Sequence, residues 1–180
     1  MEKINKALTE ENKGGNLRTI CGVAVVTAIA GLLAACSSID CPLNNRVLTN
    51  YQLTTPDGKV DTLKLYATIS TNRTDGSDSV LINRDVDFTK FTLPVSNSQP
   101  RDTFFVQLDN GEETVALDTM VVEKQDRMHF EAPDCAASYF HHITAVTATR
   151  HAIDSVTINN HEVDYDTSKT HFRIYFTPNR

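Results

Sequence analysis

Residues 62–69 read Thr62-Leu63-Lys64-Leu65-Tyr66-Ala67-Thr68-Ile69, so that four apolar side chains alternate with more polar ones. A period of two places the apolar side chains on one face of a β-strand and the others on the opposite face. Phe172-Arg173-Ile174-Tyr175-Phe176 repeats this pattern near the end of the sequence. Both segments are therefore expected to be half-buried strands, with one face on a core and the other in solvent.

Other short segments share this alternation, and no long segment shows the period of a helix. Further strands are expected at residues 47–54, 79–83, 88–95, 103–108, 114–122, 129–131, 140–149 and 154–159. Pro56-Asp57-Gly58 and Asp109-Asn110-Gly111 favour hairpin turns, because Gly adopts a positive φ at little cost. About ten strands at this spacing predict an all-β domain over residues 46–180, an antiparallel β-sandwich. An immunoglobulin-like arrangement fits the spacing, and a small β-barrel is the alternative.

The composition is acidic, which limits the expected partners. The chain has 180 residues with 17 Lys+Arg against 23 Asp+Glu, a formal net charge of −6, and no Trp. Because no basic stripe is present to contact phosphates, a nucleic-acid partner is not expected. Anionic lipid also repels an acidic surface, so any membrane contact is expected to run through an anchor alone.

The N-terminal segment has the features of an export signal. Residues 20–35 are uncharged, Arg18 precedes them, and the run ends in small residues. This run is shorter than the roughly 20 apolar residues that a membrane-spanning helix needs. Residues 1–35 are therefore interpreted as a secretory signal peptide with a short helix. An uncleaved anchor helix is the alternative.

The run Leu33-Ala34-Ala35-Cys36-Ser37 resembles the lipobox of bacterial lipoproteins. The resemblance implies that Cys36 is acylated, with palmitate among the acyl chains, and that the chain is cut before it. Residues 36–45 then form a short tether, and two or more acyl chains give stable anchoring to a membrane. Cleavage by the ordinary signal peptidase, without lipid, is the alternative. Ser37 in place of Asp after the cysteine favours the outer membrane by resemblance to lipoprotein sorting rules, with the periplasmic or surface face left open.

Two cysteines remain in the mature chain, Cys41 and Cys135. In an oxidising compartment two remaining cysteines commonly pair, which predicts a disulfide that closes a loop of roughly 95 residues. Two separate free thiols are the alternative. Neither cysteine has a second Cys or His at ligand spacing, so a zinc site is not predicted.

An Asp-Ser/Thr-apolar tripeptide occurs five times in the mature chain. It resembles the general O-glycosylation sequon of Bacteroidetes, which makes the hydroxyl after each Asp a candidate site. The candidate residues are Thr62, Ser79, Thr119 and Ser155, with Asp102-Thr103-Phe104 as the fifth tripeptide. The alternative is strand-entry chemistry, in which Asp ends a turn and the hydroxyl residue begins a strand.

The six histidines all lie late in the sequence, and His151, His161 and His171 are spaced by ten. This spacing suggests neighbours across strands and hence a metal site. The alternative, which we prefer, places them on polar strand faces, with His171 opposite Phe172. No histidine pair has HxH or HxxxH spacing, and the acidic loop at residues 72–78 does not fit the EF-hand pattern. No metal, cofactor or catalytic motif is therefore predicted, and an enzyme is not expected.

The lipobox, the repeated tripeptides and the segments 36–45 and 152–160 together resemble a family of uncharacterised cell-envelope lipoproteins from Bacteroidales. The resemblance implies membrane attachment and supplies no catalytic residues. The expected function is that of a lipid-anchored, non-enzymatic binding or structural accessory of the cell envelope. A module that binds a glycan or an envelope protein is the alternative, and an enzyme is third.

Overall fold

The computed structural model describes Cys41 and residues 46–177 of the chain. The expected signal-peptide helix, the candidate lipidation site Cys36 and tether residues 42–45 lie outside these described residues. Every regular element in the described part is a β-strand. None of the described residues belongs to a helix that is long and apolar enough to cross a membrane.

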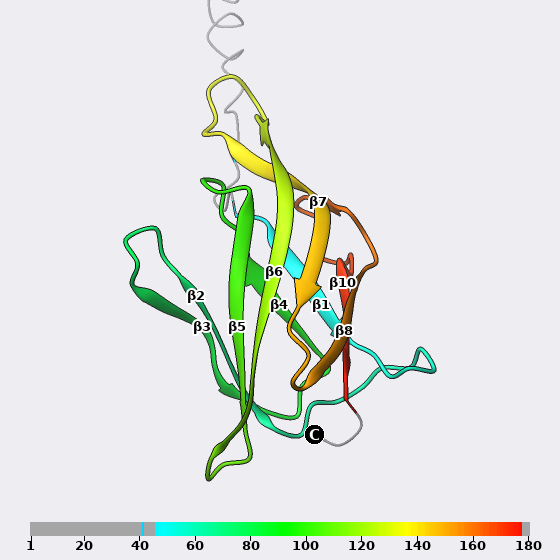
Figure 1. The fold of residues 1–180 in the computed structure, drawn as a ribbon. Helices are drawn as coiled ribbons and strands as arrows, with labels where there is room; N and C mark the ends of the chain where they lie inside the picture. The colour runs from blue at the N-terminus through cyan, green and yellow to red at the C-terminus, as the bar shows by residue number, and fades with distance from the viewer. Residues whose placement is uncertain (1–40, 42–45, 178–180) are drawn as a thin grey trace, which may run out of the picture. The chain divides into compact units, whose positions relative to one another are not determined.

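Two sheets face each other across the core (Figure 1). One sheet has four strands in the order β4-β1-β10-β8, and the other has six in the order β3-β2-β5-β6-β7-β9. The strands are β1 (Leu48–Leu53), β2 (Tyr66–Asn72), β3 (Asp78–Asp85), β4 (Lys90–Pro94), β5 (Arg101–Asp109), β6 (Thr114–His129), β7 (Ser138–Ala148), β8 (Ile153–Ile158), β9 (Glu162–Val163) and β10 (Phe172–Phe176). The predicted all-β sandwich is confirmed, and the two separate sheets exclude the closed barrel.

The sandwich is mostly antiparallel, as predicted, and one pair of strands departs from that arrangement. β1 and β10 run parallel, with Tyr51 beside Phe172 and Leu53 beside Ile174. The other strand pairs of the described residues are antiparallel. A parallel pair cannot be joined by a hairpin, and here almost the whole described domain connects the two strands.

Three strands differ from the sequence prediction by more than a few residues at their ends. β2 begins at Tyr66, while Leu63 lies before it and forms an isolated bridge with Phe88, although its side chain is buried as expected. The predicted strand at 114–122 continues without a break to His129 as one 16-residue strand, β6, and Phe130 and Glu131 of the predicted strand at 129–131 lie beyond its end. The two-residue strand β9 was not predicted, because two residues are too few to show a period.

The core holds the alternating apolar side chains of both sheets. The ring of Tyr51 lies between Phe91 and Phe172, with centroid distances of 4.8 Å and 4.7 Å. Leu53 and Ile174 beside them are at most 1% exposed. Burying each large apolar side chain stabilises the fold by roughly 1.5–3 kcal/mol before the entropy of ordering is subtracted. The alternation read from the sequence therefore identifies the residues that hold the two sheets together.

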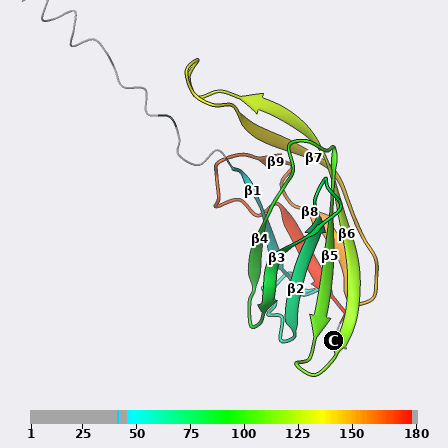
Figure 2. The same cartoon turned by 90° about the vertical axis from the view of Figure 1, so that its left-hand side faces the viewer.

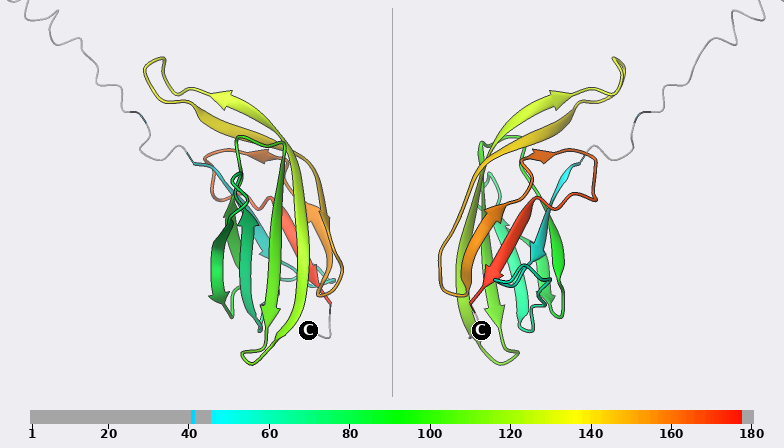
Figure 3. Two further views of the ribbon diagram at one scale, coloured as in Figure 1. Left: turned by 60° about the vertical axis from the view of Figure 1, so that its left-hand side comes forward. Right: turned by 90° about the vertical axis from the view of Figure 1, so that its right-hand side faces the viewer.

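β6 and β7 extend beyond the other strands as a long hairpin, whose outer part, residues 125–140, we call the arm (Figures 2 and 3). β6 pairs with β5 as far as Glu123 and from Lys124 onward with β7 alone. On one face of the arm, the rings of His129 and Phe140 stack 4.3 Å apart. Tyr165, which precedes β10, packs edge-on against Phe140 at 5.0 Å. The arm is therefore held to the domain by aromatic contacts on that face.

Candidate functional site

Four ionisable side chains lie where the apolar inner face of the six-stranded sheet ends. We call Asp102, Lys124, Asp126 and His141 the polar cluster. Each continues an inward-facing series: Asp102 precedes Phe104 on β5, Lys124 and Asp126 follow Val122 on β6, and His141 precedes Ile143 on β7. Asp126 and His141 are direct partners in the β6–β7 pairing. Strand alternation thus brings the four groups to one end of the core.

Lys124 is the centre of the polar cluster. Its side chain is 0% exposed, and its Nζ donates to the carbonyl oxygen of Gln99 at 2.8 Å and to Asp126 Oδ1 at 2.7 Å. The carboxylate of Asp102 lies 3.8 Å from the same nitrogen. A buried ammonium must be paired and hydrogen-bonded, because isolating it from water costs several kcal/mol. The two carboxylates and the carbonyl meet this requirement.

The surroundings shift the pKa of two members of the cluster. Burial raises the pKa of Asp102 to about 6, although the backbone N–H of Ser96 and the charge of Lys124 act in the opposite direction. Burial also lowers the pKa of His141, more strongly than its hydrogen bond to Asp126 raises it. His141 Nδ1 lies 2.7 Å from Asp126 Oδ1, and since a carboxylate only accepts, this nitrogen carries the proton. The neutral tautomer of His141 is therefore fixed by its neighbour.

The variant Asp102→Asn should change how stability depends on pH. Because the pKa of Asp102 is raised by folding, its contribution to stability is fully present below about pH 4 and is lost as pH rises through about 6. As pH rises between these limits, the free energy of unfolding of the variant should increase relative to that of the wild type by about 2 kcal/mol. Urea unfolding from pH 4 to 8 measures this difference, with the exposed-loop variant Asp134→Asn as control. Parallel pH profiles for the wild type and Asp102→Asn would contradict the assignment.

Two neighbouring hollows open beside the polar cluster. The larger has a volume of about 630 Å³ and lies between the β2–β3 hairpin, the segment after β4 and the start of β5, with Asp102 in its wall. The smaller, of about 310 Å³, lies against β7 with His141 in its wall. Both are lined by Arg46, Val95 and Ser96. The two hollows are therefore neighbours with a common wall, and each has a member of the polar cluster in its lining; we refer to them together as the groove.

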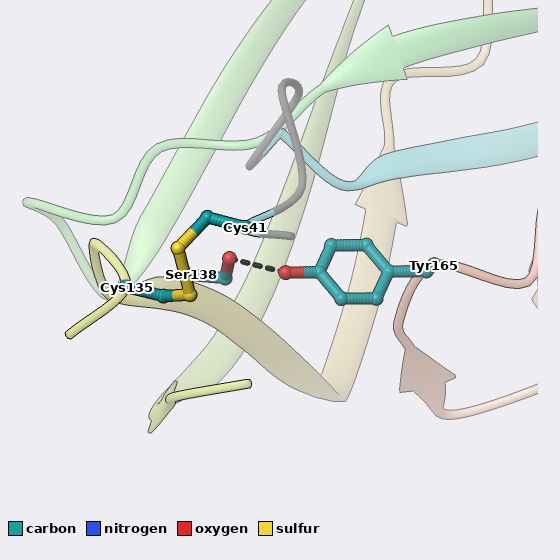
Figure 4. The surroundings of a disulfide bond; sticks show 4 residues. All are labelled: Cys41, Cys135, Ser138 and Tyr165. Carbon is teal, nitrogen blue, oxygen red and sulfur yellow. Dashed lines mark hydrogen bonds between the residues drawn. A yellow bond between two sulfur atoms is a disulfide. The ribbon is translucent and has the colours of Figure 1, made fainter. Parts of the chain in front are cut away.

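A disulfide joins Cys41 to Cys135 on the arm, as predicted (Figure 4). The two Cα atoms are 5.4 Å apart, and the residues are 94 positions apart in sequence. Close by, the hydroxyl groups of Ser138 and Tyr165 are hydrogen-bonded (Figure 4). The outer part of the arm is thus attached covalently to the start of the domain and by a side-chain contact to the chain before β10.

The candidate glycosylation residues do not gather at this site. Thr62 precedes β2, Ser79 lies on β3, Thr119 on β6 and Ser155 on β8, and all four are partly buried. In two of the tripeptides the aspartate bonds to the next residue: Asp61 accepts from the N–H of Thr62, and Asp154 accepts from the hydroxyl of Ser155. These two contacts fit the strand-entry interpretation. Asp118 does not fit it, because it lies within β6 and accepts from the N–H of His151, in the turn before β8. Glycosylation itself stays a prediction.

The expectation that His171 lies on an exposed strand face is wrong. Its side chain is 0% exposed, because His171 lies just before β10, where Nδ1 accepts from the N–H of Asn50 at 2.9 Å. The grouping of His151, His161 and His171 that their spacing suggested, and that we did not prefer, is not found among the described residues either. His151 contacts Asp118, whereas His161 stacks on His142. The three histidines lie just before β8, β9 and β10, and β9 belongs to the other sheet.

Two important residues were missed from the sequence. Lys124 resembles an ordinary surface lysine within a polar segment, and only the β6–β7 pairing brings Asp126 and His141 beside it. Asp118 was noted only as part of a tripeptide, but its carboxylate is 1% exposed and accepts four short hydrogen bonds. The position of an isolated acid within the apolar stretch 115–122 could have indicated this, because a carboxylate that is buried with its apolar neighbours needs hydrogen-bond partners.

Comparison with known proteins adds one match. Residues 62–176 match a family of unknown function, DUF6452. No curated protein and no solved structure matches the chain. The family match runs from the alternating segment before β2 to the last residue of β10 and so contains nine of the ten strands of the described sandwich. Because it spans more than half of the sequence, the chain belongs to the DUF6452 family of unknown function.

Proposed function

We propose that the chain is an exported lipoprotein, held by lipid on Cys36 at the outer membrane, and that its sandwich serves there as a non-enzymatic binding or structural accessory. The disulfide between Cys41 and Cys135 is the observation that carries this proposal. Disulfides persist in oxidising compartments outside the cytosol, which is where a signal peptide with a lipobox would deliver the chain.

The position of the disulfide also determines which part of the domain the anchor would hold near the membrane. Cys41 follows Cys36 by five positions, and five extended residues span at most about 17 Å. Because Cys41 is bonded to the arm, a lipid on Cys36 would hold the arm close to the membrane surface. In this proposal the disulfide makes the arm, as well as the start of the domain, part of the attachment to the membrane.

The groove favours binding as the role of the anchored domain. Hydroxyl and amide side chains line its larger part, including Thr71, Asn72, Ser79, Ser96 and Gln99. Such groups can donate and accept hydrogen bonds without a charge requirement, which suits a glycan or the backbone of an envelope protein. The charged residues Arg46, Arg73, Asp75 and Asp102 also line this part. The second candidate is therefore a binding module for a polar ligand.

The polar cluster supports the non-enzymatic part of the proposal. Lys124 is paired with the carboxylates of Asp126 and Asp102, and the hydrogen bonds of His141 within the described residues go to Asp126. A catalytic histidine of a nucleophilic enzyme also needs a hydroxyl or thiol in hydrogen-bond reach. The cluster is better suited to fixing the arm and the wall of the groove than to chemistry.

Replacing Cys36 by Ala should move the protein from the membrane fraction to the soluble envelope fraction, because the acyl chains supply the membrane affinity in this proposal. Fractionation followed by immunoblotting measures this effect. Cys21→Ala is the matched control, since Cys21 lies within the predicted signal peptide and should leave fractionation unchanged. Retention of Cys36→Ala in the membrane would instead indicate an uncleaved anchor helix and contradict the proposal.

A further inference from the structure

A pair of histidines lies at the edge of the six-stranded sheet, apart from the groove. His142 is on β7, and its partner across the β7–β9 pairing is Glu162. His161 directly precedes β9, and its ring lies 5.5 Å from that of His142 with an angle of 20° between the planes. The His142 side chain is 42% exposed, and His161 is also exposed. Two imidazoles are thus side by side on the surface.

Acceptor-only partners fix the tautomer of each ring. His161 Nδ1 lies 2.6 Å from the carbonyl oxygen of Ile143, and His142 Nδ1 lies 2.5 Å from Glu162 Oε1. A carbonyl oxygen and a carboxylate cannot donate, so both Nδ1 atoms carry the proton. In the neutral rings the lone pair then lies on Nε2, and within the described residues neither Nε2 has a protein partner.

We propose that His142 and His161 bind one divalent transition-metal ion through their Nε2 atoms. A histidine that ligates a metal almost always donates its other N–H to a carboxylate or a backbone carbonyl, and this pair has one partner of each kind. The carboxylate of Glu162 is in turn held by an ion pair with Arg127. The two rings are 5.5 Å apart and nearly parallel, so binding of one ion would require the rings to tilt until both Nε2 lone pairs converge on it.

Two imidazoles select the class of ion. Imidazole nitrogen suits Cu²⁺, Zn²⁺ and Ni²⁺, and the general affinity order places Cu²⁺ highest. No group of three or more potential His, Cys, Asp or Glu ligands occurs among the residues that the structure describes. Water or an external ligand would therefore complete the coordination, which makes this an open, exchangeable site rather than a structural one.

Titration of the intact protein with Cu²⁺ tests the proposal. The protein is purified without a histidine tag, in a buffer that does not coordinate metal, and binding is followed by calorimetry and electron paramagnetic resonance. The wild type should bind one ion with two coordinated imidazole nitrogens. His142→Ala and His161→Ala should each lower the affinity about tenfold or more and leave one nitrogen, because each removes half of the protein ligands.

His151→Ala is the matched control, since His151 is exposed but lies at a different turn, beside Asp118. It should bind Cu²⁺ as the wild type does. Circular dichroism of all three variants checks that the fold is intact. Unchanged affinity in the double variant His142→Ala, His161→Ala would overturn the proposal, as would loss of binding in His151→Ala.

Discussion

The double variant Cys41→Ala, Cys135→Ala is expected to unfold with a free energy about 4 kcal/mol lower than that of the oxidised wild type. The bond between these residues closes a loop across 94 positions. In the chain-entropy model a cross-link of this span lowers the entropy of the unfolded chain, which raises its free energy by about 4–5 kcal/mol. Ala is chosen because Cys135 is 6% exposed and a serine hydroxyl there would be buried. Urea unfolding of both proteins gives the difference.

The reduced wild type is the control for this measurement, since it removes the bond but keeps both side chains. Its free energy of unfolding should be close to that of the double variant. Hydrogen exchange should also become faster in the arm, because the bond holds its outer part. If oxidised wild type, reduced wild type and the double variant unfold within about 1 kcal/mol of one another, the disulfide does not support the fold as described.

Asp118→Ala is expected to lower the free energy of unfolding by about 3 kcal/mol or more. The carboxylate of Asp118 accepts from the N–H groups of His151, Ala152 and Ile153 at 2.8–2.9 Å and from the hydroxyl of Thr149 at 2.7 Å. It therefore holds the turn between β7 and β8 and so links the two sheets. Without it, buried N–H groups lose their acceptor, and each such loss costs about 1–3 kcal/mol.

The hydrogen bonds to the same carboxylate also lead us to expect a loss of stability in acid. Burial alone would raise the pKa of Asp118, but its backbone and Thr149 hydrogen bonds together hold it below the ordinary value of 3.8. A pKa that folding lowers gives stability that is present above about pH 4 and is lost as pH falls through the folded value. Urea unfolding should therefore show that the difference in free energy of unfolding between the wild type and Asp118→Asn becomes smaller at the lowest pH that keeps the protein folded.

Asp154→Asn is the control for Asp118, because Asp154 begins another of the tripeptides but is exposed. It should change the unfolding free energy by less than about 0.5 kcal/mol. Equal losses for the two positions would show that the tripeptide, rather than the buried turn, accounts for the effect.

The fold class was predictable because local patterns determine much of it. Alternation identified buried residues such as Leu63 and Ile174, which are 1% exposed. The two predicted hairpin turns contain Gly58 and Gly111 at φ values of 83° and 100°, so the positive φ inferred from the residue types is confirmed. The disulfide was predicted by combining a chemical argument about the compartment with the count of remaining cysteines.

The remaining features depend on contacts that no local pattern encodes. The outer part of β6 pairs with β7 alone and is exposed on both faces, so residues 125–128 show no alternation and resemble a loop. The parallel pairing of β1 with β10 joins opposite ends of the domain. The polar cluster and the His142–His161 pair likewise form only through strand pairing, which is why Lys124 looked like a surface residue.

The intact mass of the native protein, extracted from membranes, tests the central proposal most directly. The expected polypeptide begins at Cys36, carries the mass of its acyl chains, and is lighter by two hydrogens for the bond between Cys41 and Cys135. A polypeptide that retains its leader, or that begins elsewhere and carries no fatty acid, would contradict it.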